Sequence, residues 1–131
     1  MTRLATVIGA ALLMGCSKPD KVLTFPSSAE GIFYTVEEYH AGGPVSDTVR
    51  VIAHLERNGK SASVLVLDGE NLTVKAVRWN NESNVTICIE GGITNTFRNQ
   101  VTLFAGALSV TVRNRLDESC SDNGTAPAPV T

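Results

Sequence analysis

The chain has 131 residues, of which 43% are hydrophobic and 18% are charged, and its formal net charge is −2. This length fits one domain rather than two, and this composition is that of a globular protein rather than a disordered chain. The basic residues are scattered singly along the sequence. Because nucleic-acid binding requires a clustered cationic footprint, we expect no nucleic-acid partner.

Residues 1–15 have the layout of a secretory signal. Arg3 precedes a run of apolar and small residues from Leu4 to Gly15 that only Thr6 interrupts, and one positive charge before about a dozen apolar residues is typical of an export signal. The run is too short for a membrane-spanning helix, which needs roughly 20 residues. We therefore expect residues 1–15 to be removed on export.

The end of this run resembles a lipobox, the recognition sequence of bacterial lipoprotein signal peptidases. Leu13, Gly15 and Cys16 match that family, whereas Met14 is larger than the usual occupant of its position. The resemblance covers about the first 16 residues and implies cleavage between Gly15 and Cys16, with lipid on Cys16. Ser17 in place of Asp implies an outer-membrane location facing the periplasm. A plain secretory signal with a chance cysteine and a short buried helix are the alternatives.

Residues 16–28 predict the lipidated cysteine followed by a tether, because Pro19, Pro26 and a Ser-Ser pair punctuate them. A short edge strand at residues 22–25 fits within this tether. The segment 121–131 is rich in Gly, Ala, Thr and Pro and predicts a disordered tail. Between them, residues 29–120 predict a single β-domain.

Apolar alternation of period two predicts strands along this domain. Residues 48–56 alternate well, with Arg50, His54 and Glu56 outward and Ile52 interrupting that polar set. Their expected inward side chains are Val49, Val51, Ala53 and Leu55. The other runs expected to form strands are 31–39, 64–67, 72–79, 85–89, 101–104 and 108–112.

Turn signals separate these runs. Asn58-Gly59 between two apolar runs predicts a tight hairpin, and Asp68-Gly69 predicts the start of a second turn. Leu72, Val74 and Ala76 are expected to share one face. About seven short strands at this spacing predict an all-β fold, a small antiparallel sandwich or barrel.

Two segments of the domain also resemble known hairpin turns. Residues 28–34 and 77–87 are similar to degenerate forms of turns that occur in propeller blades and in small uncharacterised bacterial lipoproteins. The resemblance implies hairpins and carries no activity.

The chain has three cysteines, an odd number for an exported protein. The lipobox resemblance assigns Cys16 to lipid, which leaves Cys88 and Cys120. The oxidising periplasm favours a disulfide between them, which would stabilise the fold by roughly 3–4 kcal/mol. Two free thiols that lie too far apart to bond are the alternative. We expect no zinc site, because no CxxC or HxxxH spacing occurs.

No catalytic constellation is visible in the sequence. His40 and His54 are expected at a solvated strand end and on a polar strand face, respectively. No Gly-x-Ser-x-Gly, phosphate-binding loop or dinucleotide fingerprint occurs, so we expect no catalytic, cofactor or metal residues. Trp79 is expected to anchor the core at a strand end, with an exposed contact as the alternative.

These observations favour a non-enzymatic envelope lipoprotein that binds another envelope component or serves as an accessory subunit. Its expected partners are the membrane, through the lipid, and an unidentified envelope protein. One alternative is a periplasmic inhibitor of an incoming lysozyme or phage factor. Others are an enzyme with an unrecognised cell-wall activity and a structural protein without a dedicated ligand.

Overall fold

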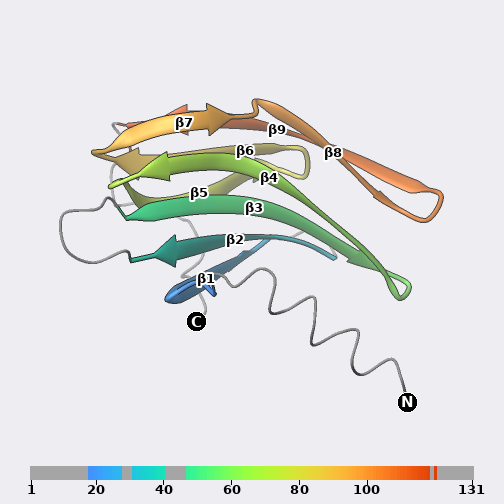
Figure 1. Cartoon of the computed structure of the whole chain (residues 1–131). Coiled ribbons are helices and arrows are strands. Elements are labelled where there is room, and N and C mark those ends of the chain that lie inside the picture. The colour runs from blue at the N-terminus through green and yellow to red at the C-terminus, as the bar shows by residue number, and fades with distance from the viewer. Residues whose placement is uncertain (1–17, 28–30, 41–46, 119, 121–131) are drawn as a thin grey trace, which may run out of the picture.

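The computed structural model describes residues 18–27, 31–40, 47–118 and 120, and the protein is all-β over this part of the chain (Figure 1). The described residues contain no helix that could span a membrane. The described residues form nine strands: β1 Lys21–Pro26, β2 Ile32–Tyr39, β3 Thr48–Arg57, β4 Lys60–Glu70, β5 Thr73–Asn81, β6 Asn84–Glu90, β7 Ile93–Phe97, β8 Gln100–Ala105 and β9 Leu108–Asp117.

The strands form two sheets that pack as a β-sandwich. Sheet A has the order β1-β2-β3-β4-β7 and sheet B the order β5-β6-β9-β8. All neighbours are antiparallel except β6 and β9, which run parallel. The structure therefore selects the sandwich over the barrel. It also contains nine strands where about seven were expected, because β1 and β7 join sheet A.

Period-two alternation places the core as expected. On β3, Val49, Val51, Ala53 and Leu55 are all buried, and on β2 the buried aliphatic and aromatic side chains alternate in the same way. The inward residues of both sheets form one apolar cluster. Each fully buried aliphatic side chain contributes about 1.5–3 kcal/mol to this core.

The hairpin between β3 and β4 follows directly from the sequence. Asn58 and Gly59 adopt φ values of 54° and 76°, and Arg57 pairs with Lys60 across them. Two central residues with positive φ make the turn whose twist matches that of the flanking strands. The predicted hairpin is confirmed.

Three sequence expectations about strand boundaries were wrong in detail. Asp68-Gly69 does not begin a turn, because β4 continues to Glu70 and the positive φ falls at Asn71. The expected edge strand at residues 22–25 exists as β1, so the folded domain begins at Lys21 rather than at residue 29.

The third correction concerns β5. Its pairing with β6 shifts between Val74 and Ala76, which leaves Lys75 as a bulge. A bulge inserts one extra residue and reverses which side chains face inward. Val77 therefore takes the fully buried position, and Ala76 is only half-buried.

The disulfide predicted between Cys88 and Cys120 is present, with a Cα–Cα distance of 5.6 Å. It ties the segment after β9 back to β6, across 32 residues of sequence. The expected signal peptide (1–15), the lipidated Cys16 and the expected tail (121–131) lie outside the described residues.

Candidate functional site

The outer face of sheet A carries rings and aliphatic groups where the solvated face of an antiparallel sheet is normally polar. The strand register aligns its side chains in three rows across β1, β2, β3 and β4. We call these rows the ring face: Pro26, Phe33, His54 and Ser63; Thr24, Thr35, Ile52 and Leu65; Val22, Glu37, Arg50 and Asp68.

His54 is the centre of the first row. Its imidazole stacks on Phe33 with ring centroids 4.7 Å apart and an interplanar angle of 9°. Its Nε2 lies 2.8 Å from Thr35 Oγ1, and its Nδ1 lies 2.8 Å from Ser63 Oγ. Two hydroxyls and a ring therefore hold the imidazole in one orientation on the sheet surface.

This arrangement differs from a nucleophilic triad. In a triad, one imidazole nitrogen accepts the proton of the nucleophile and a carboxylate orients the other nitrogen. At His54, a hydroxyl oxygen lies within hydrogen-bond distance of each of the two ring nitrogens. The geometry therefore fixes a flat polar and aromatic surface.

A second group of interactions lies at the other end of the ring face. Tyr39 donates a hydrogen bond of 2.6 Å to Glu37 Oε1, and the Arg50 guanidinium lies 5.4 Å from the centre of the Tyr39 ring. Arg50 Nε also lies 3.7 Å from Asp68 Oδ1. A chain of charges and rings thus runs across β2, β3 and β4.

Partial burial on this face perturbs its titratable groups. Burial lowers the pKa of His54, although the carboxylates of Glu37 and Glu56 act in the opposite direction. The pKa of Tyr39 is raised by burial and by the hydrogen bond and charge of Glu37, against the effect of Arg50. Perturbed groups gather at functional sites more often than elsewhere.

The middle row of the ring face is its most apolar part. Thr35 is only 7% exposed although it faces outward, and Ile52 and Leu65 beside it are half-buried. Phe33 adds a half-buried ring, and Val22 on β1 is exposed. The ring face therefore combines a half-buried apolar centre with a charged end.

The outer face of sheet B is different in character. Thr102 and Thr111 join β8 to β9 by a hydrogen bond of 2.9 Å, and Arg113 and Arg115 on β9 are exposed. Arg115 Nη2 lies 3.7 Å from Asp117 Oδ2. The outer face of sheet B is thus mostly hydroxyl and guanidinium groups.

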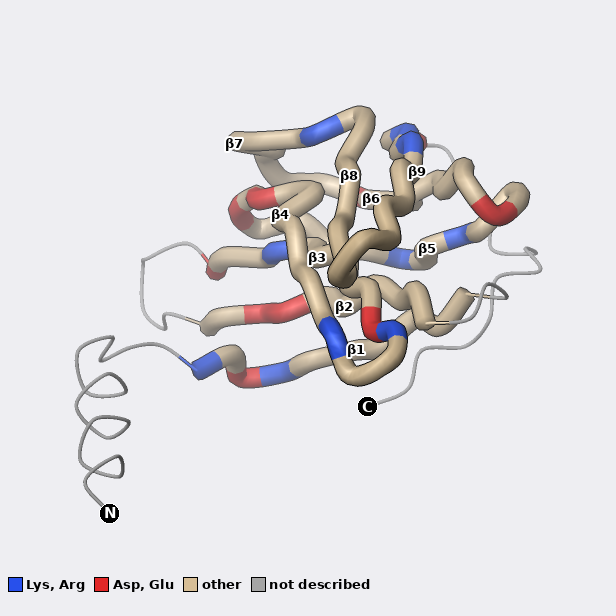
Figure 2. The backbone as a smooth tube through the Cα atoms, turned by 90° about the vertical axis from the view of Figure 1, so that its right-hand side faces the viewer, with Lys and Arg blue, Asp and Glu red and all other residues tan. Residues whose placement is uncertain are grey.

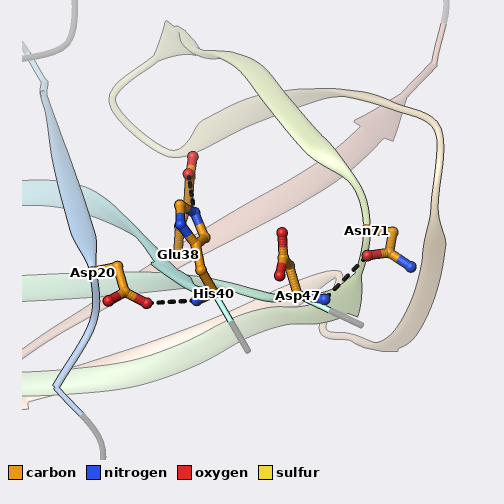
Figure 3. A network of polar contacts seen from close by, with 5 residues as sticks. All are labelled: Asp20, Glu38, His40, Asp47 and Asn71. Carbon is orange, nitrogen blue, oxygen red and sulfur yellow. Dashed lines mark hydrogen bonds and ion pairs between the residues drawn. The ribbon is translucent and has the colours of Figure 1, made fainter. Parts of the chain in front are cut away.

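A second polar cluster lies at the end of the sandwich where β1 and β3 begin and β2 ends (Figure 3). The backbone N–H of His40 donates to Asp20 Oδ2 at 2.5 Å, and its Nε2 lies 3.4 Å from Glu38 Oε1. Asp47 and Asn71 bond to each other through both their backbones and the Asn71 side chain.

This cluster borders a pocket of about 280 Å³ that is also lined by Val49, Leu72 and Thr73. The His40 side chain is 52% exposed, which agrees with its expected place at a solvated strand end. Among the described residues, no group of three or more His, Cys, Asp and Glu side chains could hold a metal ion. The interactions form two separate pairs: Asp20 and His40 join the start of β1 to the end of β2, and Asp47 and Asn71 join the start of β3 to the end of β4.

The structure places the remaining predicted residues as follows. Trp79 packs against the core and meets the Tyr34 ring edge-on at 5.4 Å, so its expected anchoring role is confirmed. Gly15 and Cys16 lie outside the described residues. The ring face was not predicted from the sequence, in which its one signal is Ile52, the residue that interrupts the polar set of β3.

The described residues form a small β-sandwich domain, and the outer face of its sheet A contains a half-buried apolar row. Comparison with known proteins finds no matching protein-family model, no similar curated protein and no similar solved structure.

Proposed function

We propose that this protein is a non-enzymatic lipoprotein of the bacterial envelope that acts as a binding module or accessory subunit, and that its ring face contacts another envelope protein. The observation that carries the proposal is the burial pattern of the ring face. Phe33, Ile52, Leu65 and Val22 lie together on one outer face, and a docked partner would cover the parts of these side chains that water still reaches.

The composition of the ring face supports a protein partner. Aromatic residues and arginine are enriched at the energetically dominant positions of protein interfaces, and here Phe33, Tyr39 and Arg50 occupy one face. Hydrogen bonds and stacking already order His54 and Tyr39. Such preorganisation lowers the entropic cost of binding.

The proposed membrane attachment rests on the lipobox resemblance at residues 13–16. The test is the intact mass of the protein purified from the membranes of a bacterium that processes lipoproteins. We expect a chain that starts at Cys16 and carries added lipid, and a Cys16→Ser variant that is neither lipidated nor cleaved there. An unmodified chain of 131 residues would refute the anchor.

The binding proposal is tested by site-specific photocrosslinking in cells. A benzophenone amino acid replaces Phe33 on the ring face or, as the matched control, Thr111 on the outer face of sheet B. We expect light to produce one discrete adduct with an envelope protein from position 33 and none from position 111.

An added Ile52→Asp substitution should abolish the adduct from position 33, because a carboxylate would enter the apolar row. A Thr111→Asp substitution should leave it unchanged. Adducts of equal strength from both faces, or none from position 33, would refute the ring face as the binding surface.

A further inference from the structure

The chain joins the folded sandwich at Asp20. The backbone N–H of Asp20 donates to the carbonyl oxygen of Glu38 at 2.7 Å, and the backbone N–H of His40 donates to Asp20 Oδ2 at 2.5 Å. From Lys21 onward, β1 pairs with β2 without a register shift. The chain is therefore fixed to sheet A from Asp20 onward.

The proposed lipid anchor, Cys16, lies only four residues before Asp20. Four residues span at most about 14 Å when fully extended, whatever conformation they adopt. Because β1 is an edge strand of sheet A (Figure 2), its start is a corner of the sandwich. A chain anchored at Cys16 therefore holds this corner close to the membrane.

The same limit confines the ring face. Its residue farthest from Asp20 is Ser63, which lies in the row of Pro26 and three strands away from β1. The rise per residue along a strand and the spacing between strands place Ser63 about 25 Å from Asp20. The whole ring face is then within about 40 Å of the anchored Cys16.

The ring face is also small for a protein interface. Three rows of side chains across four strands cover about 400 Å², whereas a stable interface buries about 800 Å² on each partner. Half of that area favours a weak contact between freely diffusing proteins. Confinement of both proteins to one membrane raises their effective concentration and offsets the small area.

We propose that the partner of the ring face is held in the same membrane as this protein, either as an integral protein or through its own lipid. Its contact site lies within about 40 Å of the membrane surface, where the short tether keeps the ring face. This inference rests on the proposed function and names the class of its partner. A freely diffusing soluble partner would gain no effective concentration from the anchor.

The test compares photocrosslinking from position 33 in three forms of the chain. The first is the natural form, anchored through Cys16. The second is the mature chain with Cys16→Ser, exported by a secretory signal that is cleaved and leaves no lipid. At matched amounts, we expect the second form to give at least about ten-fold less adduct than the first, because it has lost the gain in effective concentration.

The third form carries the same Cys16→Ser change behind a single transmembrane helix. It should restore the adduct, because the proposal requires attachment to the membrane rather than the lipid itself. It also shows that the substitution leaves a competent ring face. Circular dichroism of the purified second form checks that its lost adduct does not reflect an unfolded domain.

A separate measurement concerns the captured partner. In cells that lack this protein, the partner should stay with the membranes after an alkaline carbonate wash, which removes proteins held only by contacts with other proteins. The matched control for every form is position 111 on the outer face of sheet B, from which we expect no protein adduct.

An unanchored chain that gives as much adduct as the anchored one would overturn this inference and leave the ring face as the binding surface. A partner released by the wash, or a transmembrane form that gives no adduct, would overturn it in the same way. No adduct from position 33 of the natural form would instead refute the proposed function, and the inference would fall with it.

Discussion

Sheet A and sheet B differ in the interactions that connect their neighbouring segments. On sheet A, His54 stacks on Phe33 and contacts the Thr35 hydroxyl. Separately, Arg50 contacts the Tyr39 ring and pairs with Asp68. On sheet B, the Cys88–Cys120 disulfide fastens the end of the chain to β6. Sheet B therefore carries the covalent reinforcement, and sheet A carries the partly buried polar groups.

This difference leads us to expect that changes on the two sheets affect different properties of the protein. A disulfide stabilises the fold through its effect on the unfolded chain and needs no particular surface. Half-buried rings on an outer face contribute modestly to stability through cross-strand contacts, and under the proposed function they would offer a partner a preformed surface. Removal of the disulfide on sheet B should therefore affect mainly stability, and changes on the outer face of sheet A should affect mainly binding and pH dependence.

The largest expected effect is removal of the disulfide. A Cys88→Ala/Cys120→Ala variant should lose about 3–4 kcal/mol of unfolding free energy, because its unfolded chain is no longer constrained by the loop. Urea denaturation of the wild-type and variant proteins measures this loss. The wild-type protein treated with reductant serves as the control, and an unchanged midpoint in both would contradict the prediction.

The next effect distinguishes an inward tyrosine from an outward one. Tyr34 is fully buried, and its hydroxyl donates to Asn114 Oδ1, which joins sheet A to sheet B. Tyr34→Phe leaves the buried Asn114 Oδ1 without this donor and should lower the unfolding free energy by about 1–3 kcal/mol. Tyr39→Phe removes only the hydrogen bond to Glu37 and should cost less than Tyr34→Phe in the same denaturation experiment. Equal losses would contradict the comparison.

A smaller, pH-dependent effect is expected at His54. Because burial lowers its pKa in the folded protein below the ordinary 6.5, the unfolded chain binds the proton more readily. The contribution of neutral His54 to stability is therefore complete above the ordinary pKa. It is lost as the pH falls below that value and through the folded-state pKa.

This dependence is measured as the unfolding free energy at about pH 7.5 and about pH 5.5, on either side of the ordinary value for histidine. His54→Gln should reduce the loss between these two pH values relative to the wild-type protein. A His54→Gln variant with the full wild-type loss would show that another group is responsible.

The smallest effect is expected for the ion pair at the charged end of the ring face. The Arg50 side chain is 48% exposed and that of Asp68 is 28% exposed, so water and salt screen their attraction. Asp68→Asn should cost about 0.2–1 kcal/mol, within the range of exposed pairs. A loss above this range would mean that Asp68 supports the fold in another way.

The sequence by itself determined the local features of this protein. Alternation placed Val51 and Leu55 in the core because strand geometry has a strict period of two. Asn58-Gly59 specified the β3–β4 hairpin because few residues adopt positive φ. The disulfide could be predicted once the lipobox resemblance removed Cys16 from the three cysteines.

Only the tertiary structure decided the pairing of distant segments. The parallel contact of β6 with β9, the passage of the chain from β7 in sheet A to β8 in sheet B, and the bulge at Lys75 arise between strands. The ring face likewise requires Phe33, His54 and Ser63 to meet across three strands. No local pattern encodes such contacts, because they depend on register and on which strands become neighbours when the whole core is buried.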